Sequence, residues 1–324
     1  MKRFKNILCF VGTESNETAV NRAINLAIEN DAAVTFMDVV KPLPVALGGI
    51  TDVADPEELA DLLAKDHRQK LLQRVAEYVD TDVPIDVVVA VGDPATQIVR
   101  QVLRDKHDLV IKSADGLSRA GRLFGSIARS LLRQCPCPVW ILKPETHKTF
   151  ARVLAAVDMA SSDETHQHLN TNIIQLAHSI ANREGAELHL VFASDLWMEK
   201  ILRKRAGDTE IDRALDQVEE QSLRRLNSLI DSMGIERDDV RIHMRRGPAA
   251  EVIRNVADHI ESDLLVMGTV CRTGISGLLI GNVAETVLAD ITCSVLALKP
   301  DGFETSVKLG GQAETSDNFF FSMS

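Results

Sequence analysis

Residues 268–282 read GTVCRTGISGLLIGN, with glycine at 268, 274, 277 and 281. The apolar run LLVM precedes this segment, and the helix-like stretch NVAETVLAD follows its last glycine. A strand, a glycine-bearing loop and a helix start can together bind a phosphate, because glycine lets backbone N–H groups approach the anion and the helix adds further donors. The alternative is a glycine turn without a ligand.

A carboxylate is expected beside this loop. Val157 and Asp158 follow the apolar strand that opens the same half of the chain, and the carboxyl ends of parallel strands meet at one edge of a sheet. Asp158 could accept hydrogen bonds from a ribose or an adenine, or it could be a helix cap or a loop carboxylate. The helix after the loop is predicted to begin at Asn282, because Glu285 follows three residues later as in a capping box.

Arginines supply the candidate cations. Arg272 lies inside the glycine loop and is the best placed to meet a phosphate. Arg245 and Arg246 precede a Gly-Pro turn at a strand end, where an anion could also bind; a solvated face is the alternative.

The elements that must position these residues occur twice. The matching segments are 7–42 with 153–194, 85–113 with 240–269, and 131–144 with 287–300. Each half alternates strands with amphipathic helices, and the strands are unbroken apolar runs. The whole pattern repeats with a period of about 155 residues. This pattern predicts an α/β protein with two tandem, doubly wound parallel sheets covered by helices on both faces.

The predicted domains are residues 1–146 and 147–305, joined near 143–148 and followed by a flexible tail at 306–324. Long helices are predicted at 57–79 and 210–233. The loop at 268–282 then follows the fourth strand of its half and lacks Gly-Lys-Ser/Thr. It is therefore neither a dinucleotide fingerprint nor a Walker loop.

The net charge of −11 disfavours nucleic acid and anionic membranes as main partners. No apolar run is long enough to span a membrane, and the N-terminal segment does not resemble a secretion signal. Five cysteines do not indicate a disulfide framework, so a cytoplasmic protein is expected.

Three other motifs combine residues that could do chemistry with a plainer structural interpretation. Cys135 and Cys137 resemble a metal or redox pair, but without a second pair nearby they are expected to pack at a strand entry. Cys271 could be a reactive thiol, although no partner base is evident. His166 and His168, two residues apart, are expected at a solvated helix start rather than on zinc.

Over residues 5–302 the chain resembles tandem universal stress proteins of the E type, most specifically in MGTVCRTGISGLLIGNVAETVL. Nucleotide-binding members of that family carry Gly, two residues, Gly, nine residues and Gly followed by Ser or Thr, with an Asp ending the first strand. In this chain Cys271 replaces the middle glycine and Asn282 replaces the hydroxyl. The nucleotide-binding set carried over is Val157, Asp158, Val191, Met267, Gly268, Cys271, Arg272, Gly281, Asn282 and Val283.

The resemblance also implies five-stranded sheets of order 3-2-1-4-5, related by a pseudo-twofold axis and paired through their last strands as an intramolecular pseudo-dimer. A homodimer remains open. The first half departs further, since Gly12 stands where the Asp would be and Lys112 and Ser113 begin the equivalent loop. We expect no nucleotide there.

Three functions remain open from the sequence. The first is a stress-response binding protein that holds ATP, another adenine nucleotide or a similar phosphate-bearing ligand in its second half, without catalysis. The second is a weak nucleotide hydrolase. The third is an adaptor without a nucleotide, or a carrier of a hydrophobic small molecule beneath the long helices.

Overall fold

The computed structural model describes residues 3–12, 17–42, 56–78, 81–114, 124–143, 149–160, 163–195, 198–269 and 281–309. The chain divides into two compact units. Unit 1 comprises residues 1–114, 126–144 and 305–324, and unit 2 comprises residues 115–125 and 145–304. The units are described one at a time.

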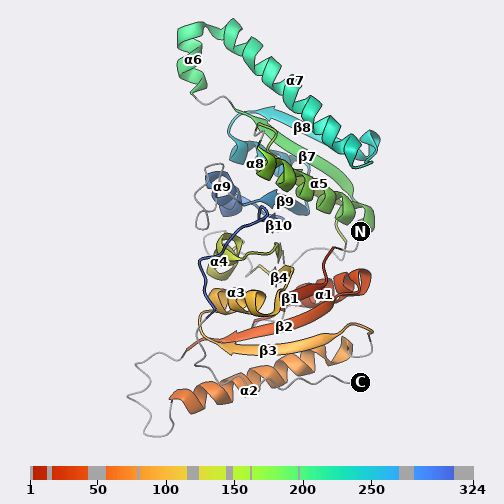
Figure 1. Ribbon diagram of the computed structural model, residues 1–324, viewed down its shortest axis with the longest axis vertical. Coiled ribbons are helices and arrows are strands. Elements are labelled where there is room, and N and C mark those ends of the chain that lie inside the picture. The colour runs from red at the N-terminus through yellow and green to blue at the C-terminus, as the bar shows by residue number, and fades with distance from the viewer. Residues whose placement is uncertain are drawn as a thin grey trace. The chain divides into compact units, whose positions relative to one another are not determined.

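Unit 1 contains a parallel sheet in the order β3-β2-β1-β4-β5 (Figure 1). Helix α1 lies on one face of this sheet, and α3 and α4 lie on the other (Figure 1). The strands are β1 (Asn6–Phe10), β2 (Ala33–Val40), β3 (Ile85–Val91), β4 (Leu109–Ser113) and β5 (Val139–Leu142). The helices are α1 (Glu17–Asn30), α2 (Pro56–Val75), α3 (Pro94–Asp105) and α4 (Ser126–Gln134), with a 3-10 turn at Ala76–Tyr78.

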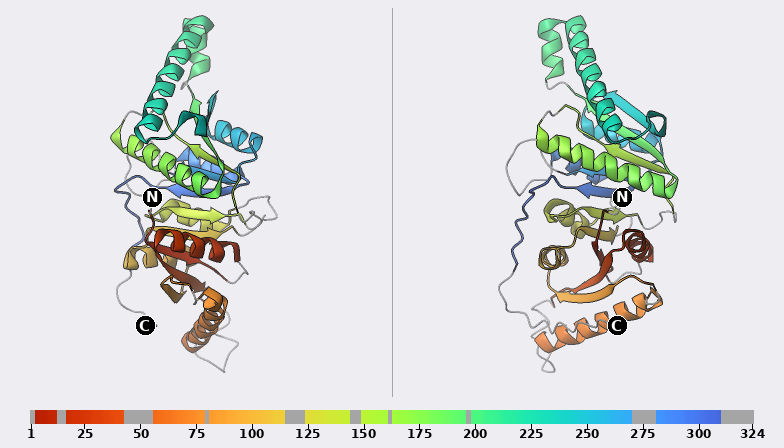
Figure 2. Two further views of the ribbon diagram at one scale, coloured as in Figure 1. Left: turned by 90° about the vertical axis from the view of Figure 1, so that its right-hand side faces the viewer. Right: turned by 45° about the vertical axis from the view of Figure 1, so that its right-hand side comes forward.

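Unit 2 repeats this plan in the order β8-β7-β6-β9-β10, with α5 running across one face of its strands (Figure 2). Its strands are β6 (Arg152–Ala156), β7 (Glu187–Ser194), β8 (Val240–Arg246), β9 (Leu264–Gly268) and β10 (Ser294–Leu298). Its helices are α5 (Glu164–Glu184), α6 (Glu199–Ala206), α7 (Asp208–Ser232), α8 (Ala249–His259) and α9 (Asn282–Asp290), with a 3-10 turn at Arg237–Asp239.

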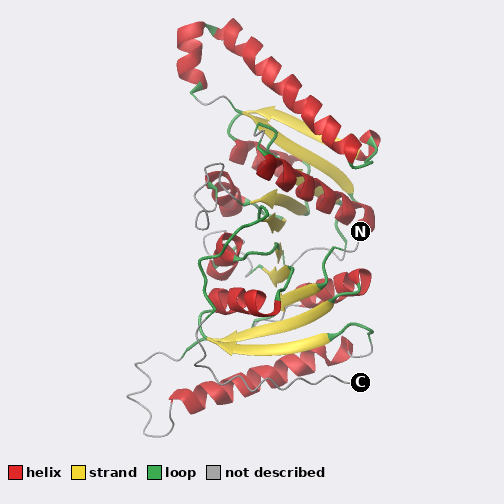
Figure 3. Cartoon of the chain, viewed as in Figure 1, coloured by secondary structure: helices red, strands yellow, loops and turns green. Residues whose placement is uncertain are grey.

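The predicted α/β fold and the order 3-2-1-4-5 are confirmed within each unit. The pseudo-twofold axis, the pairing of last strands and the domain boundaries stay predictions. Helix α7 matches the helix expected at 210–233, whereas α6 was not expected. Figure 3 shows α6 and α7 as two helices joined by a short turn.

The strands that position the edge residues are buried along their length. In β1 and β6 every residue after the first is buried, and β4 and β10 are buried throughout. Helices on both faces exclude water from such strands, which explains their unbroken apolar sequences. Burial of this kind holds the strand ends at fixed positions.

An aspartate fastens the amino-terminal edge of each sheet. In unit 1, Asp108 accepts the backbone N–H groups of Lys5 at 2.6 Å and Asn6 at 3.1 Å, one on each carboxylate oxygen. In unit 2, Asp263 accepts those of Ala151 at 2.7 Å and Arg152 at 2.9 Å on a single oxygen. The aspartate before the fourth strand of each half therefore anchors the start of the first strand.

Two histidines of unit 2 share a hydrogen bond between neighbouring strands. His189 Nδ1 lies 2.8 Å from His243 Nε2, with ring centroids 5.1 Å apart and planes inclined by 12°. These values describe rings joined nearly in line through one N–H···N bond. Burial lowers the pKa of both imidazoles, and the adjacent His189 and Arg245 lower that of His243 further.

We expect unit 2 to lose stability as the pH falls below about 6.5, the ordinary pKa of histidine. The unfolded chain then binds protons that folded His189 and His243 do not, and stability falls wherever the unfolded state binds more protons. Urea unfolding at a series of pH values should show this loss, and His243→Gln should make it shallower. Constant or rising stability on acidification would contradict the expectation.

Among the described residues, no helix combines the length and the hydrophobicity required to cross a bilayer.

Candidate functional site

Five of the predicted site residues meet at the carboxyl edge of the unit 2 sheet. The Val157 N–H donates to the Val191 carbonyl at 3.0 Å, immediately after β6. Met267 pairs in register with Ala156, so Gly268 at the end of β9 lies beside the end of β6, where Asp158 follows. Cys271 and Arg272 lie outside the described residues.

The start of α9 is held next to the end of β9 by Thr269. This residue is fully buried, and its N–H donates to the Leu298 carbonyl at 3.1 Å. Its own carbonyl accepts the Gly281 N–H at 3.0 Å. This bond joins the two ends of segment 270–280 and brings Gly281, Asn282 and Val283 to the edge that carries Asp158. Nothing in the sequence pattern distinguished Thr269.

The capping box predicted at Asn282 is wrong. Gly281 is the N-cap residue, with φ −62° and ψ 143°, and its carbonyl accepts the Glu285 N–H at 2.9 Å. Asn282 is therefore the first helical residue, with an exposed side chain. Because glycine supplies no capping side chain, the first N–H groups of α9 depend on other acceptors, which a phosphate could provide.

Gly268 is close-packed against α5. A Cβ built at this position would lie 2.7 Å from Leu169 Cδ2 and 3.7 Å from Ile173 Cδ1. Contacts below about 3 Å are well inside the optimal carbon separation. A side chain at this position would require Leu169 to shift, so the glycine permits close helix–strand packing, whereas the sequence suggested close approach to a ligand.

Asp158 is held at its backbone and at its side chain. Its N–H donates to Asn170 Oδ1 at 3.0 Å, and its carbonyl accepts Asn170 Nδ2 at 2.7 Å. Its Oδ1 accepts the Ala160 N–H at 3.1 Å. The cap of α5 is Asp163, whose side chain accepts the His166 N–H, so the helix-cap interpretation of Asp158 is wrong.

Asn170 was missed by the sequence reasoning. It is only 4% exposed, although it is polar and follows Leu169 on the buried side of α5. A polar residue within an apolar helical stripe was the signal that could have identified it.

The corresponding edge of unit 1 differs in the residues that would meet a nucleotide. Gly12 follows β1 with φ +66°, and a Cβ there would lie 3.4 Å from the Phe10 ring. Lys112, in the register position of Met267, is buried and donates through Nζ to the Ser113 carbonyl at 2.7 Å. At Gly12 this edge lacks the side chain that Asp158 provides in unit 2.

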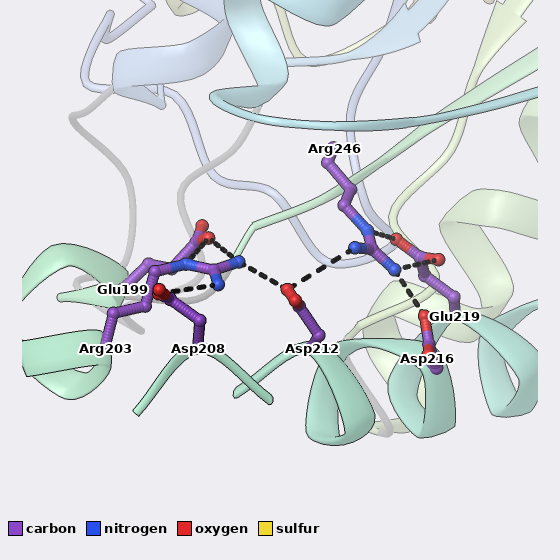
Figure 4. Close-up of polar contacts among 7 residues, drawn as sticks. All are labelled: Glu199, Arg203, Asp208, Asp212, Asp216, Glu219 and Arg246. Atoms are coloured by element: carbon purple, nitrogen blue, oxygen red, sulfur yellow. Dashed lines mark hydrogen bonds and ion pairs between the residues drawn. The ribbon is translucent and has the colours of Figure 1, made fainter. Parts of the chain in front are cut away.

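Arg245 and Arg246, where the sequence suggested that an anion could bind, already have hydrogen-bond or ion-pair partners within the chain. Arg246 contacts Asp216 and Glu219 of α7, each at 2.6 Å (Figure 4). Arg245 donates to the Met244 carbonyl at 2.9 Å. These contacts tie α7 to the end of β8, so Arg246 is not an open phosphate donor.

The same network continues into α6. Arg203 contacts Glu199 at 2.7 Å and Asp212 at 2.8 Å, and Asp212 lies 4.0 Å from Arg246 (Figure 4). Arg203 thus binds acidic residues of α6 and α7, the two helices that Gly207 joins. Water screens exposed ion pairs of this kind, so they orient α6 and α7 more than they stabilise them.

The remaining motifs lie as the packing interpretations expected. Cys135 and Cys137 are buried with their Sγ atoms 3.6 Å apart, and their mutual hydrogen bond together with burial raises the pKa of Cys137. His166 sits in the first turn of α5, with Nδ1 2.6 Å from Asp163. Within the described ranges no cluster of three or more His, Cys, Asp or Glu could hold a metal.

Comparison with protein families places both halves in one group. A model of the universal stress protein family matches residues 3–143 and again 149–299. Universal stress protein E of Escherichia coli strain K12 is 31% identical over 274 residues, covering 79% of this chain and 85% of that protein. Universal stress protein E of Photorhabdus laumondii is 27% identical over 316 residues, covering 95% and 99%.

Solved structures agree on the fold. A Pseudomonas aeruginosa UCBPP-PA14 protein described as a universal stress protein superposes with a TM-score of 0.67 at 25% identity, covering 93% of this chain and 95% of that one. A universal stress protein from Archaeoglobus fulgidus DSM 4304 gives 0.60 at 18% identity, covering 90% and 98%. The second likeness bears on the fold alone.

Proposed function

The chain belongs to the universal stress protein family with two domains in tandem, and from this premise we propose that it binds one adenine nucleotide, or a similar phosphate-bearing ligand, in unit 2. It then acts as a cytoplasmic stress-response binding protein whose state reports ligand occupancy. No catalytic step is required for this role.

One observation carries the proposal: the Asp158 strand end and the glycine-capped start of α9 lie at the same sheet edge. The N–H groups at the start of α9 suit phosphate oxygens, with the positive end of the helix dipole behind them. The Asp158 carboxylate suits the hydroxyl or amino donors of a nucleoside.

Other members of the predicted set have supporting roles. Val157, Val191 and Met267 supply apolar surface beneath a base, and the exposed Val283 and Asn282 flank the phosphates on α9. Asn282 can donate through its amide where relatives carry a hydroxyl. Cys271 and Arg272 remain predicted contacts of the loop.

Unit 1 is proposed to bind no nucleotide. Gly12 offers no carboxylate, and the buried Lys112 side chain occupies the register position of Met267. The first unit then serves as structure or takes a different ligand.

The test is ATP titration of the full chain and of Asp158→Ala. We expect the substitution to weaken ATP binding about 10- to 100-fold, the range for a hydrogen bond to a charged group. Asp238→Ala, an exposed aspartate of the same unit, is the matched control and should leave affinity unchanged.

Failure of the unmodified chain to bind ATP, or equal affinity in Asp158→Ala, would refute the proposal. ATP hydrolysis that disappears with Asp158→Ala would instead favour a weak hydrolase. Native mass spectrometry of protein purified from cells would identify a retained apolar molecule and so favour a carrier.

A further inference from the structure

Two consecutive residues of α5 contact the two strand ends of the site. Leu169 packs against Gly268 at the end of β9, and Asn170 binds Asp158 after β6. These strands are neighbours in the sheet. One turn of one helix therefore sets both positions that the proposed nucleotide would meet.

At Asp158 the side chain of Asn170 takes the place of a neighbouring strand as the hydrogen-bond partner of the backbone. The Val157 N–H still reaches the Val191 carbonyl of β7 at 3.0 Å, but the next residue turns to α5. There the side-chain amide of Asn170 offers a donor and an acceptor side by side, as a peptide group does. It accepts from the Asp158 N–H and donates to the Asp158 carbonyl, at 3.0 Å and 2.7 Å.

Burial makes the hydrogen bonds between Asn170 and Asp158 costly to break. Asn170 is 4% exposed, so its amide cannot exchange these bonds for water without cost. A further hydrogen bond, from the Ala160 N–H to Asp158 Oδ1 at 3.1 Å, restrains the carboxylate itself. The Asp158 side chain is thus oriented before any ligand arrives, and preorganisation of this kind strengthens binding.

We propose that Asn170 is a positioning residue for nucleoside recognition, acting through Asp158 without touching the ligand. The inference rests on the proposed function, because it assigns a role within the same site. It requires that the benefit of Asn170 to binding disappear when the Asp158 carboxylate is absent.

A double-mutant cycle tests this requirement. ATP dissociation constants are measured for the unmodified chain, Asn170→Ala, Asp158→Ala and the double variant, with thermal unfolding of each. We expect Asn170→Ala to weaken binding about 10-fold, and the double variant to bind no more weakly than Asp158→Ala alone. Asn182→Ala, an exposed asparagine of the same helix, is the control and should not change affinity.

A readout without ligand accompanies the cycle. Hydrogen exchange at the Asp158 amide should accelerate in Asn170→Ala, while amides in the centre of β6 stay protected. Should Asn170→Ala fold poorly, Asn170→Ser keeps a neutral hydroxyl in the buried site, which can replace one of the two hydrogen bonds to Asp158. It should give a smaller loss of affinity with the same coupling to Asp158.

The outcomes separate the two claims. No ATP binding by the unmodified chain refutes the proposed function and this inference with it. Unchanged ATP affinity in Asn170→Ala, or losses that add in the double variant, refutes the positioning role alone. An unchanged exchange rate at Asp158 would also overturn it.

Discussion

Gly268→Ala is expected to lower the free energy of unfolding of unit 2 by about 1–3 kcal/mol, the range for overpacking a filled core. The new Cβ would approach Leu169 Cδ2 at 2.7 Å, and Leu169 is itself buried. Gly268→Val, with two further carbons, should cost more. Chemical denaturation of the full chain, followed by a probe in unit 2, measures the change.

Ser113 of unit 1 is the matched control, because it holds the same place at the end of the fourth strand. Its Oγ is buried and finds no hydrogen-bond partner in the described part of the chain. Ser113→Ala removes an unsatisfied polar atom and should be neutral or stabilising. Equal destabilisation by Gly268→Ala and Ser113→Ala would show that the α5 contact is not what requires glycine.

Asp108→Ala and Asp263→Ala are each expected to cost about 2–4 kcal/mol, because each removes two backbone hydrogen bonds to a charged acceptor. The asparagine variants should then differ between the units. Asp263 uses one oxygen for both N–H groups, which asparagine can imitate. Asp108 uses both oxygens, so asparagine would oppose one N–H with its own donor.

Urea unfolding of the four variants measures these differences in the free energy of unfolding. Asp263→Asn should be milder than Asp263→Ala, whereas Asp108→Asn should lie near Asp108→Ala. Equal costs for the two asparagine variants would contradict the assigned hydrogen-bond pattern.

The repeated pattern in the sequence was sufficient to predict parallel α/β sheets, whereas the strand order within each unit followed from the family resemblance. Apolar runs such as those at 109–113 and 264–268 are unbroken because both sheet faces are covered, and this signal survives without structural information. Helix α6 was not predicted from the sequence. Two acidic partners of its Arg203, Asp208 and Asp212, come later in the chain and become neighbours only once α7 folds back.

The site was predicted less completely, for physical reasons. The spacing of residues in the sequence located Asp158 and Gly268. That α5 contacts both of them is seen only in the folded structure. The helix start at Asn282 was predicted correctly, but its cap depended on the backbone angles of Gly281, which a capping pattern does not determine. The roles of Cys271 and Arg272 stay predictions.

The two units show how a duplicated fold can keep its architecture while its site diverges. The anchoring aspartate recurs as Asp108 and Asp263, since every such sheet must fasten its first strand. The strand-end residue does not recur, because Gly12 stands in unit 1 where Asp158 stands in unit 2.

The most direct measurement is the number of nucleotides bound per chain, determined by native mass spectrometry of the full-length protein in the presence of ATP. The account predicts a single bound nucleotide, which Asp158→Ala removes and which changes at Gly12 leave in place. Two nucleotides per chain, or none at saturating ATP, would contradict it.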